Sequence, residues 1–356
     1  MIECEGLVLR TWHEVPSVEE LTVDPPGPAE VRVRVSAAGL CHTDLSAVRD
    51  ARSTPMVLGH EGAGVVESVG IGVTGLEPGT PVLLCWKTPC GLCPKCSAGK
   101  MYLCERVLDV GEPRVFWRGN PVARILNTGC FSELVVVPAR AVVPFDDVLP
   151  PELVALVGCA VATGVGAVLR TAGVEAGSSL AVWGAGGVGL NVVFGAKIAR
   201  ASTIVAVDPD PERRHLAVDR GATHAVAPED VLGCVEDATG GRGLDYAFET
   251  VGQPAVMTEA LSTLGVGGKL VIIGAAARDA EMTFLPRGFM SKQQSIVGCI
   301  YGSVYPHRDL PLFIEWLREG ILVLDDLVAP RLRLEDLPSE FESPTREGVR
   351  AVVTLP

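Results

Sequence analysis

Four cysteines lie close together in the first third of the chain, and their spacing is that of metal ligands. Cys90 and Cys93 are followed by Cys96 and, after seven more residues, by Cys104. A tetrahedral Zn²⁺ takes four thiolates, and two-residue gaps between cysteines let neighbouring thiolates bind one ion. Glycine, proline and lysine surround these residues, which indicates a loop without a hydrophobic core of its own. Because no ligand position remains for a substrate, the pattern predicts a closed, structural zinc site.

Disulfides and a redox motif are the competing interpretations of these cysteines. The chain carries eleven cysteines in all. Its first ten residues show neither a basic region nor an apolar run, so we expect no signal peptide and a cytoplasmic location. Cysteines in a reducing compartment are free, metal-bound or catalytic, which disfavours disulfides. A redox Cys-x-x-Cys motif is disfavoured because no thioredoxin-like βαβ pattern surrounds it. The cysteines without an evident partner are interpreted as small, buried apolar residues: Cys4, Cys85, Cys130, Cys234 and Cys299.

A second set of metal-ligand residue types is spread along the chain. Cys41 follows a predicted strand, His60 comes 19 residues later, and Cys159 lies far down the sequence. Two thiols and an imidazole are three protein ligands of an open, catalytic zinc site, which keeps its fourth position for substrate. A single Cys or His of this kind is usually a packed core residue. Spacing by itself does not bring the three together.

A glycine-rich segment in the second half of the chain has the spacing of a dinucleotide-binding turn. The segment Gly184-Ala-Gly-Gly-Val-Gly189 follows a strand-like apolar run and opens a helical pattern. Gly184 allows a tight turn, Gly186 lets the backbone approach a pyrophosphate at the helix N-terminus, and Gly189 lets the helix pack on the sheet. Asp208, 19 residues beyond Gly189, is placed to accept hydrogen bonds from a ribose and to repel a 2′-phosphate, which predicts NAD rather than NADP. A flexible turn closing a βα unit is the competing interpretation.

The elements that must position these residues change character along the chain. Residues 1 to about 150 carry short alternating runs such as Glu30–Val35, and this period of two predicts a β-rich, barrel-like region. From about 150 to 300, apolar strands alternate with helical stretches, which predicts a parallel sheet. The strands expected there are Ser179–Trp183, Thr203–Val207, Asp245–Phe248 and Lys269–Ile273. The last residues return to mixed patterning and end in a strand, Gly348–Thr354.

Length predicts the number of domains, and charge disfavours several classes of partner. A chain of 356 residues predicts two domains, and a formal net charge of −13 disfavours nucleic acid, whose phosphates need an excess of Lys and Arg. The same charge disfavours an anionic membrane surface. Leu153–Leu169 and Gly177–Ala196 are uncharged and approach the length of a membrane span. Their glycine and alanine content favours buried elements of an α/β core, so we expect no membrane partner.

The motifs, in this order, resemble one known family. Gly59-His60-Glu61-x-x-Gly64-x₅-Gly70-x-x-Val73 resembles, at every specified position, the zinc signature of the zinc-containing medium-chain alcohol dehydrogenases. The turn that begins at Cys41, the four-cysteine lobe, the segment Gly158–Gly164 and the glycine turn also resemble that family, over nearly the whole chain. Residues 118–132 are most similar to the branch of liver-type and thiol-adduct formaldehyde dehydrogenases.

The resemblance implies a two-domain α/β fold. Residues 1–157 with 301–356 would form a GroES-like, β-rich catalytic domain, and residues 158–300 a Rossmann domain with a doubly wound parallel sheet that binds NAD. It implies hydride transfer between an alcohol and NAD, with an aldehyde or other carbonyl compound as the oxidised partner. It also implies two zinc ions per subunit, one catalytic and one structural. The expected assembly is a homodimer or homotetramer formed through the cofactor domain, with the strand before Tyr301 pairing across subunits.

The resemblance also assigns roles at the catalytic zinc. Its protein ligands would be Cys41, His60 and Cys159, with Glu61 near the metal as a transient ligand or electrostatic partner. Thr43 would hold the substrate oxygen and accept its proton. Asp44 would orient His60 or an adjacent ligand. Liver-type enzymes carry a proton-relaying histidine where this chain has Ser46, so we expect a changed pH–rate profile with intact chemistry.

Cofactor and substrate contacts follow from the same resemblance. His42 and Arg350 would contact the pyrophosphate and Arg213 the adenosine ribose, with solvated surface charge as the competing interpretation. The expected NAD-binding residues are His42, Thr163, Gly184, Gly186, Gly187, Val188, Gly189, Asp208, Arg213 and Arg350. The expected pocket residues are Trp86, Ile125, Leu126 and Cys130, with Cys85 adjacent. These are mostly apolar and suit an aromatic or medium-chain alcohol, although core packing explains them equally well.

Two alternative functions stay open. A formaldehyde dehydrogenase acting on a thiol adduct would need cationic residues at the pocket mouth, for which Arg114, Arg118 and Arg124 are the candidates. A non-catalytic nucleotide-binding or structural protein on the same fold would be expected to lack the catalytic ligands. Cys41, His60 and Cys159 are all present, which favours an enzyme.

Overall fold

The chain folds into two compact units. The computed structural model describes residues 1–356 except residues 52, 107–110 and 344–348. The first unit is Met1–Cys159 with Tyr305–Pro356, and the second is Ala160–Val304. The boundaries expected from the sequence fall after residues 157 and 300, whereas the units change after residues 159 and 304.

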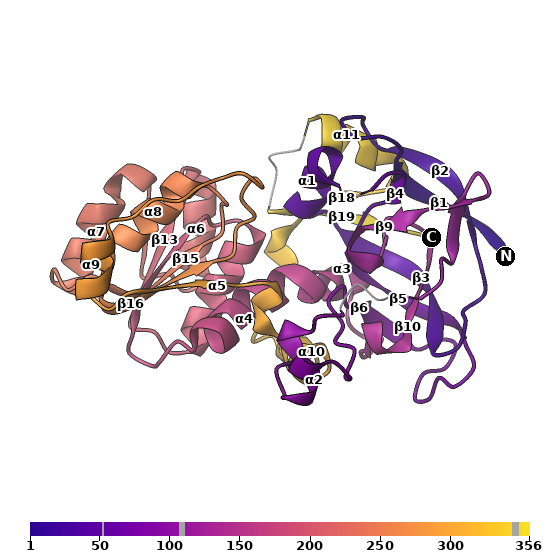
Figure 1. Cartoon of the computed structure of the whole chain (residues 1–356), viewed down its shortest axis with the longest axis horizontal. Coiled ribbons are helices and arrows are strands. Elements are labelled where there is room, and N and C mark those ends of the chain that lie inside the picture. Colours follow the sequence, from indigo (N-terminus) through magenta and orange to yellow (C-terminus); the bar gives the residue numbers. More distant parts are fainter. Residues whose placement is uncertain (52, 107–110, 344–348) are drawn as a thin grey trace. The chain divides into compact units, whose positions relative to one another are not determined.

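Two β-sheets build the first unit (Figure 1). One contains β1 (Ile2–Leu9), β2 (Ser17–Val23), β4 (Met56–Val57), β7 (Val115–Trp117), β8 (Asn120–Pro121) and β9 (Ala123–Arg124) in the order β8-β7-β2-β1-β4-β9. The other contains β3 (Glu30–Gly39), β5 (Glu61–Val69), β6 (Pro81–Leu84), β10 (Leu134–Pro138), β11 (Val142–Pro144), β18 (Val328–Leu332) and β19 (Arg350–Thr354). Its order is β11-β6-β5-β3-β19-β18, with β10 also paired to β3.

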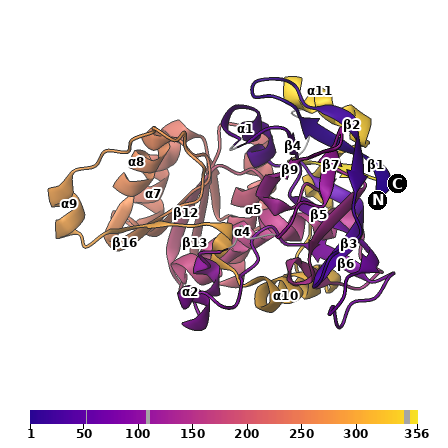
Figure 2. The same cartoon turned by 45° about the vertical axis from the view of Figure 1, so that its right-hand side comes forward.

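The alternating residues expected to form a strand at Glu30–Val35 lie in β3, and the apolar ones form part of the inner face of this second sheet. Val31, Val33 and Val35 are fully buried, and β3 runs beside β5 (Figure 2). Alternate residues of a strand point to one face, so these valines form the centre of the apolar core. The helices of this unit are α1 (His42–Asp50), α2 (Pro94–Ser97), α3 (Pro151–Leu156), α10 (Pro306–Arg318) and α11 (Leu337–Glu342), with short 3₁₀ turns η1 (Met101–Leu103), η2 (Ile125–Asn127), η3 (Ala139–Ala141), η8 (Asp325–Leu327) and η9 (Leu334–Asp336).

The second unit is a parallel sheet flanked by helices (Figure 1). Its strands are β12 (Ser179–Trp183), β13 (Thr203–Val207), β14 (His224–Val226), β15 (Leu244–Glu249), β16 (Leu264–Ile272) and β17 (Ser295–Gly298). Its helical segments are α4 (Ala162–Gly166), η5 (Ala167–Ala172), α5 (Gly187–Ile198), α6 (Pro211–Asp219), η6 (Pro228–Asp230), α7 (Val231–Thr239), α8 (Pro254–Ser262), α9 (Pro286–Ser291) and η7 (Tyr301–Ser303). The order β14-β13-β12-β15-β16-β17 is that of a doubly wound Rossmann sheet.

The strands β12 and β13 begin and end where the sequence pattern places them, and β15 and β16 are longer than expected. The structure adds β14 and β17 at the two edges of the sheet. Both are short and contain polar residues, so neither shows the continuous apolar run of a central parallel strand.

One helical stretch among the described residues, Pro151–Ala172, is long and apolar enough to cross a membrane by length and composition alone. The fold buries 89% of its apolar window, as expected for a core helix. This is the interpretation that its glycine and alanine content favours.

Candidate active site and metal centres

The helix α1 begins at the first candidate ligand. Cys41 is its N-cap, and Asp44, three residues later, accepts the backbone N–H of Cys41 at 3.1 Å. A carboxylate in the first helical turn also interacts favourably with the helix dipole. Asp44 is fully buried, and it accepts the backbone N–H of Gly59 at 2.9 Å. Its Oδ1 lies 3.2 Å from Nδ1 of His60, so one carboxylate connects the two turns that carry Cys41 and His60.

The backbone conformation immediately before His60 requires a glycine at position 59. Its φ is +90°, and a Cβ added there would lie 2.4 Å from the backbone nitrogen of Phe131. The backbone N–H of Phe131 donates to Leu58 at 2.9 Å, and that of Cys130 donates to Gly59 at 2.8 Å. The turn before His60 is therefore held directly against a neighbouring backbone, which only glycine permits.

Cys159 lies in a π-helical turn, η4 (Val157–Val161). Such turns widen a helix locally and are frequent at functional sites. A Cβ on the preceding Gly158 would lie 2.9 Å from the carbonyl oxygen of Leu84, so the helix passes close to the end of β6. This close approach brings Cys159 to the other ligands.

The ligand atoms of Cys41, His60, Glu61 and Cys159 lie within 4.8 Å of one another, and all four residues are buried. The Sγ of Cys159 is 3.6 Å from Nε2 of His60, whose Nδ1 faces Asp44. A zinc ion about 2.3 Å from each sulfur spaces tetrahedral ligands about 3.8 Å apart, so the cluster fits the ion. A carboxylate on the second imidazole nitrogen is the usual support of a metal-bound histidine.

The buried thiols influence each other strongly. The hydrogen bond with Cys159 lowers the pKa of Cys41 well below its usual range, and the same bond raises the pKa of Cys159. Burial alone would lower the pKa of His60, but the charge and hydrogen bond of Asp44 outweigh burial and raise it. Thiolates and a neutral imidazole are the forms that bind zinc, so loading this site must release protons.

Arg350 and Glu61 form a buried pair beside this cluster. Nη2 of Arg350 lies 3.5 Å from Oε1 of Glu61, and Nη1 donates to the carbonyl oxygen of Leu40 at 3.0 Å. Burial raises the pKa of Glu61 to about 7, against the opposing charge of Arg350. Arg350 is 8% exposed, so its guanidinium is directed inside the first unit. Its contact with the pyrophosphate stays a prediction.

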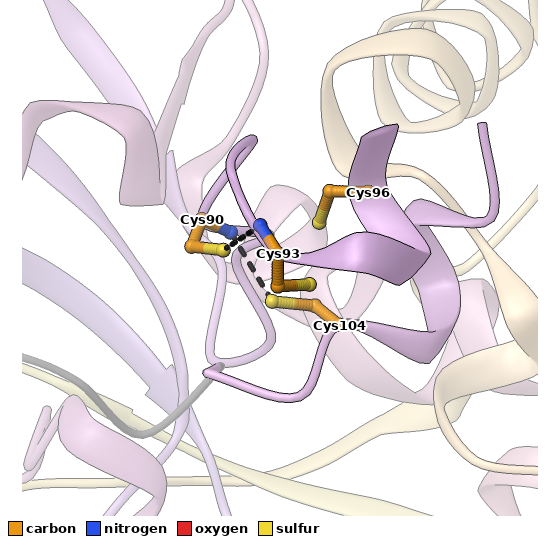
Figure 3. Close-up of side chains that lie close together, drawn as sticks. All are labelled: Cys90, Cys93, Cys96 and Cys104. Carbon is orange, nitrogen blue, oxygen red and sulfur yellow. Dashed lines mark hydrogen bonds between the residues drawn. The ribbon is translucent and has the colours of Figure 1, made fainter. Parts of the chain in front are cut away.

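The four-cysteine loop gathers its thiols at one centre (Figure 3). The ligand atoms of Cys90, Cys93, Cys96 and Cys104 lie within 4.8 Å of one another. The backbone N–H of Cys90 donates to Sγ of Cys104 at 3.2 Å, and that of Cys93 to Sγ of Cys90 at 3.3 Å. Backbone N–H groups, first that of Glu105, lower the pKa of Cys93 to about 6. Sulfur atoms that accept N–H groups are suited to the thiolate form, whereas burial raises the pKa of Cys96 to about 12. Four thiols at one centre fit a structural zinc ion, whose binding would have to release the proton of Cys96.

The glycine turn has the geometry of a nucleotide cradle. Gly184 has a φ of +92°, and a Cβ on Gly189 would lie 1.7 Å from the carbonyl oxygen of Gly184. Gly186 is different, because a Cβ there would meet only Nη1 of Arg213, at 3.9 Å, among the described atoms. Gly184 therefore allows the turn to close and Gly189 allows the helix to pack on it, while Gly186 leaves room for a ligand. The helix α5 follows with no side chain capping its N-terminus, which leaves N–H groups for phosphate.

Asp208 is tied to this turn. It is 3% exposed, and its Oδ2 accepts the backbone N–H of Ala185 at 2.7 Å. The spacing between the glycines and Asp208 thus corresponds to a direct contact at the carboxyl ends of β12 and β13. These ends are where Rossmann folds bind nucleotides.

The remaining predicted residues lie in varied surroundings. His42 and Thr43 are exposed in the first turn of α1, and Ser46 is half-buried one turn later. The other NAD contacts expected in the second unit are Thr163, buried in α4, and Gly187 and Val188, half-buried at the start of α5. Of the expected pocket residues, Trp86 and Leu126 are half-buried. Ile125 and Cys130 belong to the apolar core, which for these two residues favours core packing, the interpretation that competes with a pocket. Cys4 and Cys85 are buried as expected, but Cys234 and Cys299 are half-buried.

Sequence reasoning missed three features of the site. The pairing of Arg350 with Glu61 joins residues that no local pattern links. The link from Asp44 to the backbone of Cys41 does have a signal, since an acceptor three residues after an N-cap is the spacing of a capping box. The hydroxyl of Thr128, which donates to the carbonyl oxygen of Gly59 at 3.2 Å, carries no such signal.

Known proteins are similar to this chain over nearly its whole length. The family model described as "Alcohol dehydrogenase GroES-like domain" matches residues 27–147, and that described as "Zinc-binding dehydrogenase" matches residues 187–319. The NDMA-dependent alcohol dehydrogenase of Amycolatopsis methanolica is 37% identical over 367 residues, 99% of each chain. The class-3 alcohol dehydrogenase of Myxine glutinosa is 35% identical, over 100% of this chain and 98% of that one.

Solved structures agree. A zinc-binding domain protein of the alcohol dehydrogenases from Burkholderia ambifaria has a TM-score of 0.93 at 32% identity, over 100% of this chain and 99% of that one. Benzyl alcohol dehydrogenase from Acinetobacter calcoaceticus has a TM-score of 0.92 at 28% identity, over 100% of both chains. Fold and site together define a zinc- and dinucleotide-binding oxidoreductase with a GroES-like and a Rossmann domain. The chain belongs to the zinc-containing medium-chain alcohol dehydrogenase family.

Proposed function

We propose that this protein is a zinc-dependent alcohol dehydrogenase that transfers a hydride between a small apolar alcohol and NAD. The observation that carries the proposal is the buried convergence of Cys41, His60 and Cys159. A chain that only bound nucleotides would not need two thiols and an imidazole within reach of one ion. The second unit supplies the glycine turn and Asp208 for the cofactor.

The residues of the site divide the chemistry among them. Zinc, when bound by the two thiols and the imidazole, supplies a Lewis acid that polarises the substrate oxygen. Asp44 fixes the tautomer of His60 so that Nε2 faces the ligand cluster. Thr43, exposed two residues after Cys41, offers a hydroxyl that holds the substrate oxygen and accepts its proton. Ser46, one turn further along α1, continues the path of that proton toward solvent.

The cationic candidates for a thiol-adduct site have other partners. Arg114 donates to Oε2 of Glu30 at 2.8 Å, and Arg118 lies 4.5 Å over the ring of Trp117. Arg124 is half-buried, and it donates to the backbone carbonyl of Val136. A negatively charged thiol adduct would need cations that face it, so these contacts favour an uncharged alcohol.

An aromatic or medium-chain alcohol is the substrate class that we propose. The half-buried Trp86 and Leu126 offer apolar surface, and the benzyl alcohol dehydrogenase of Acinetobacter calcoaceticus is similar over the full chain. A thiol-adduct formaldehyde dehydrogenase stays the alternative, since residues 118–132 resemble that branch.

A homo-oligomer is the assembly that we propose. The edge strand β17 pairs with β16 on one side, and no second partner strand appears within the wholly described second unit. Large apolar side chains near this edge are exposed: Phe284, Leu285, Met290 and Ile300. An open edge with apolar neighbours favours pairing with a second copy. Light scattering after gel filtration tests this, with Leu285→Glu expected to lower the mass and Ile71→Glu, in the first unit, as the matched control.

An alcohol panel tests the proposed activity. Zinc-loaded protein is assayed with ethanol, hexanol, benzyl alcohol and a thiol–formaldehyde mixture, each with NAD, with NADP and with NAD plus NDMA. We expect NAD reduction that is fastest with benzyl alcohol or hexanol and is lost in His60→Ala. Preference for the thiol mixture would favour the alternative. Two zinc ions per chain with no turnover of any alcohol would support a non-catalytic protein.

A further inference from the structure

Two arginines and two aspartates meet where β13 ends and α6 begins. Rossmann proteins that take NADP commonly place an arginine near the ribose 2′-phosphate, so the sequence Asp208-Pro-Asp210-Pro-Glu-Arg213-Arg214 carries mixed signals for the cofactor. We propose that Asp210 is a specificity-determining residue that holds Arg213 away from the role of phosphate receptor and so favours NAD over NADP. This inference rests on the proposed function and concerns residues of the second unit alone.

Asp208 is committed to the backbone. Its Oδ2 accepts the N–H of Ala185 at 2.7 Å, and its Oδ1 accepts the N–H of Asp210 at 2.9 Å. At 3% exposure it is an anchor between the glycine turn and the end of β13. Its free lone pairs still suit a ribose hydroxyl, but its charge is already partly balanced by two N–H groups.

The two arginines differ in their contacts. Nη1 of Arg214 donates to the carbonyl oxygens of Asp208 and Pro209 at 2.8 and 2.9 Å, so its guanidinium is bound to the backbone that directly follows β13. Arg213 points the other way, toward the glycine turn. Apart from the residues adjacent to Gly186 in the chain, its Nη1 is the described atom that a Cβ on Gly186 would meet, at 3.9 Å. Arg213 is therefore the cation that an entering phosphate would meet.

Asp210 forms an ion pair with Arg213. Its Oδ2 is 3.8 Å from Nε of Arg213, and its Oδ1 accepts the N–H of Glu212 at 2.9 Å as the N-cap of α6. The cap fixes the carboxylate, because one oxygen is held by the helix while the other faces the guanidinium. A 2′-phosphate would have to displace this ion pair and approach a fixed negative charge. NAD carries a hydroxyl there and meets neither cost.

Substitutions separate this role from helix capping. Asp210→Asn keeps an acceptor for the cap and removes the charge, and Glu212→Gln removes a charge from the same helical turn as the matched control. Arg213→Ala and the double variant Asp210→Asn/Arg213→Ala complete a double-mutant cycle. Dissociation constants of NADH and NADPH are measured by direct titration of the zinc-loaded protein, and kcat/KM is measured with NAD and NADP.

We expect Asp210→Asn to tighten NADPH binding about tenfold, the change that a difference of about 1.4 kcal/mol produces, with less than a twofold change for NADH. The gain should vanish in the Arg213→Ala background, and Glu212→Gln should change neither nucleotide. Equal effects on both nucleotides, or a gain that survives Arg213→Ala, would overturn the inference while leaving the dehydrogenase intact. A parent protein that binds neither nucleotide would overturn the proposed function and this inference together.

Discussion

The Oδ1 of Asp44 lies 3.2 Å from Nδ1 of His60. The same carboxylate accepts the backbone N–H of Cys41 and of Gly59, so it sets both the orientation of an imidazole and the separation of two ligand-bearing turns. Residues that hold metal ligands in this way contribute to the affinity of the site for its metal ion even though they do not touch the ion.

Asp44→Asn should weaken the catalytic zinc site. The amide keeps the size of the side chain but loses the charge that orients His60, so we expect zinc affinity to fall by about 10- to 100-fold. Competition with a chromogenic chelator measures this. Asp50→Asn, which removes the same charge from the exposed end of α1, is the control and should retain zinc as the parent does. Equal retention by the two variants would contradict a role for Asp44 in metal binding.

How far the sequence predicts this molecule depends on the distance between the residues involved. The four-cysteine loop and the glycine turn are local, so their spacing alone predicts the observed clusters. Cys41 and Cys159 are 118 residues apart, and their approach depends on a π-helical turn and the glycine at position 158. No periodicity in the sequence predicts the π-helical turn or the close approach at Gly158. Family resemblance predicts the ligand set, while neither a local sequence pattern nor that resemblance predicts the pair formed by Arg350 and Glu61.

Gly59→Ala should be costly because two effects add. An alanine at a φ of +90° costs about 1–2 kcal/mol, and its Cβ would collide with the backbone nitrogen of Phe131. Gly72→Ala is the matched control, since Gly72 has a φ of +82° with no described atom within 4 Å of the added carbon. We expect a loss of about 1 kcal/mol for Gly72→Ala and of at least about 3 kcal/mol for Gly59→Ala. Denaturant unfolding measures both, and equal losses would rule out the collision.

Removing one thiol of the four-cysteine loop should remove one metal ion. Cys96→Ser leaves three thiols, which is one ligand short of a closed tetrahedral site. We expect zinc content to fall from about two to about one per chain, and Tm to fall by about 10 °C because metal binding stabilises a loop without its own core. Cys234→Ser, at a half-buried cysteine outside both clusters, should retain both ions. Full zinc content in Cys96→Ser would contradict the structural site.

The buried Glu249 should make stability depend on pH. Burial raises its pKa, against hydrogen bonds from the N–H groups of Gly252 and Val251. The folded protein therefore holds this proton more tightly than the unfolded chain. Its stabilising effect is complete below the ordinary pKa of 4.5 and is lost as pH rises through the folded-state pKa.

Glu249→Gln removes that dependence, since the amide does not ionise and its oxygen can still accept both N–H groups. The Tm of the variant minus that of the parent should therefore increase as pH rises from about 4.5 to about 8. The exposed Glu236→Gln, in α7, should show no such trend. A difference that is constant with pH would show that Glu249 has the same proton affinity in both states.

Ser46→His tests the path of the proton. Ser46 is half-buried in the second turn of α1, at the position to which the resemblance to liver-type enzymes assigns a relaying histidine. An imidazole titrates near pH 6.5, so it would give the path a group that changes charge in the working range, which a serine hydroxyl does not. We expect kcat against pH to gain an inflection between about pH 6 and 7 in Ser46→His and not in Ser46→Ala. Profiles of the same shape in the two variants would show that the proton leaves by another route, with the ribose hydroxyl of the cofactor as the next candidate.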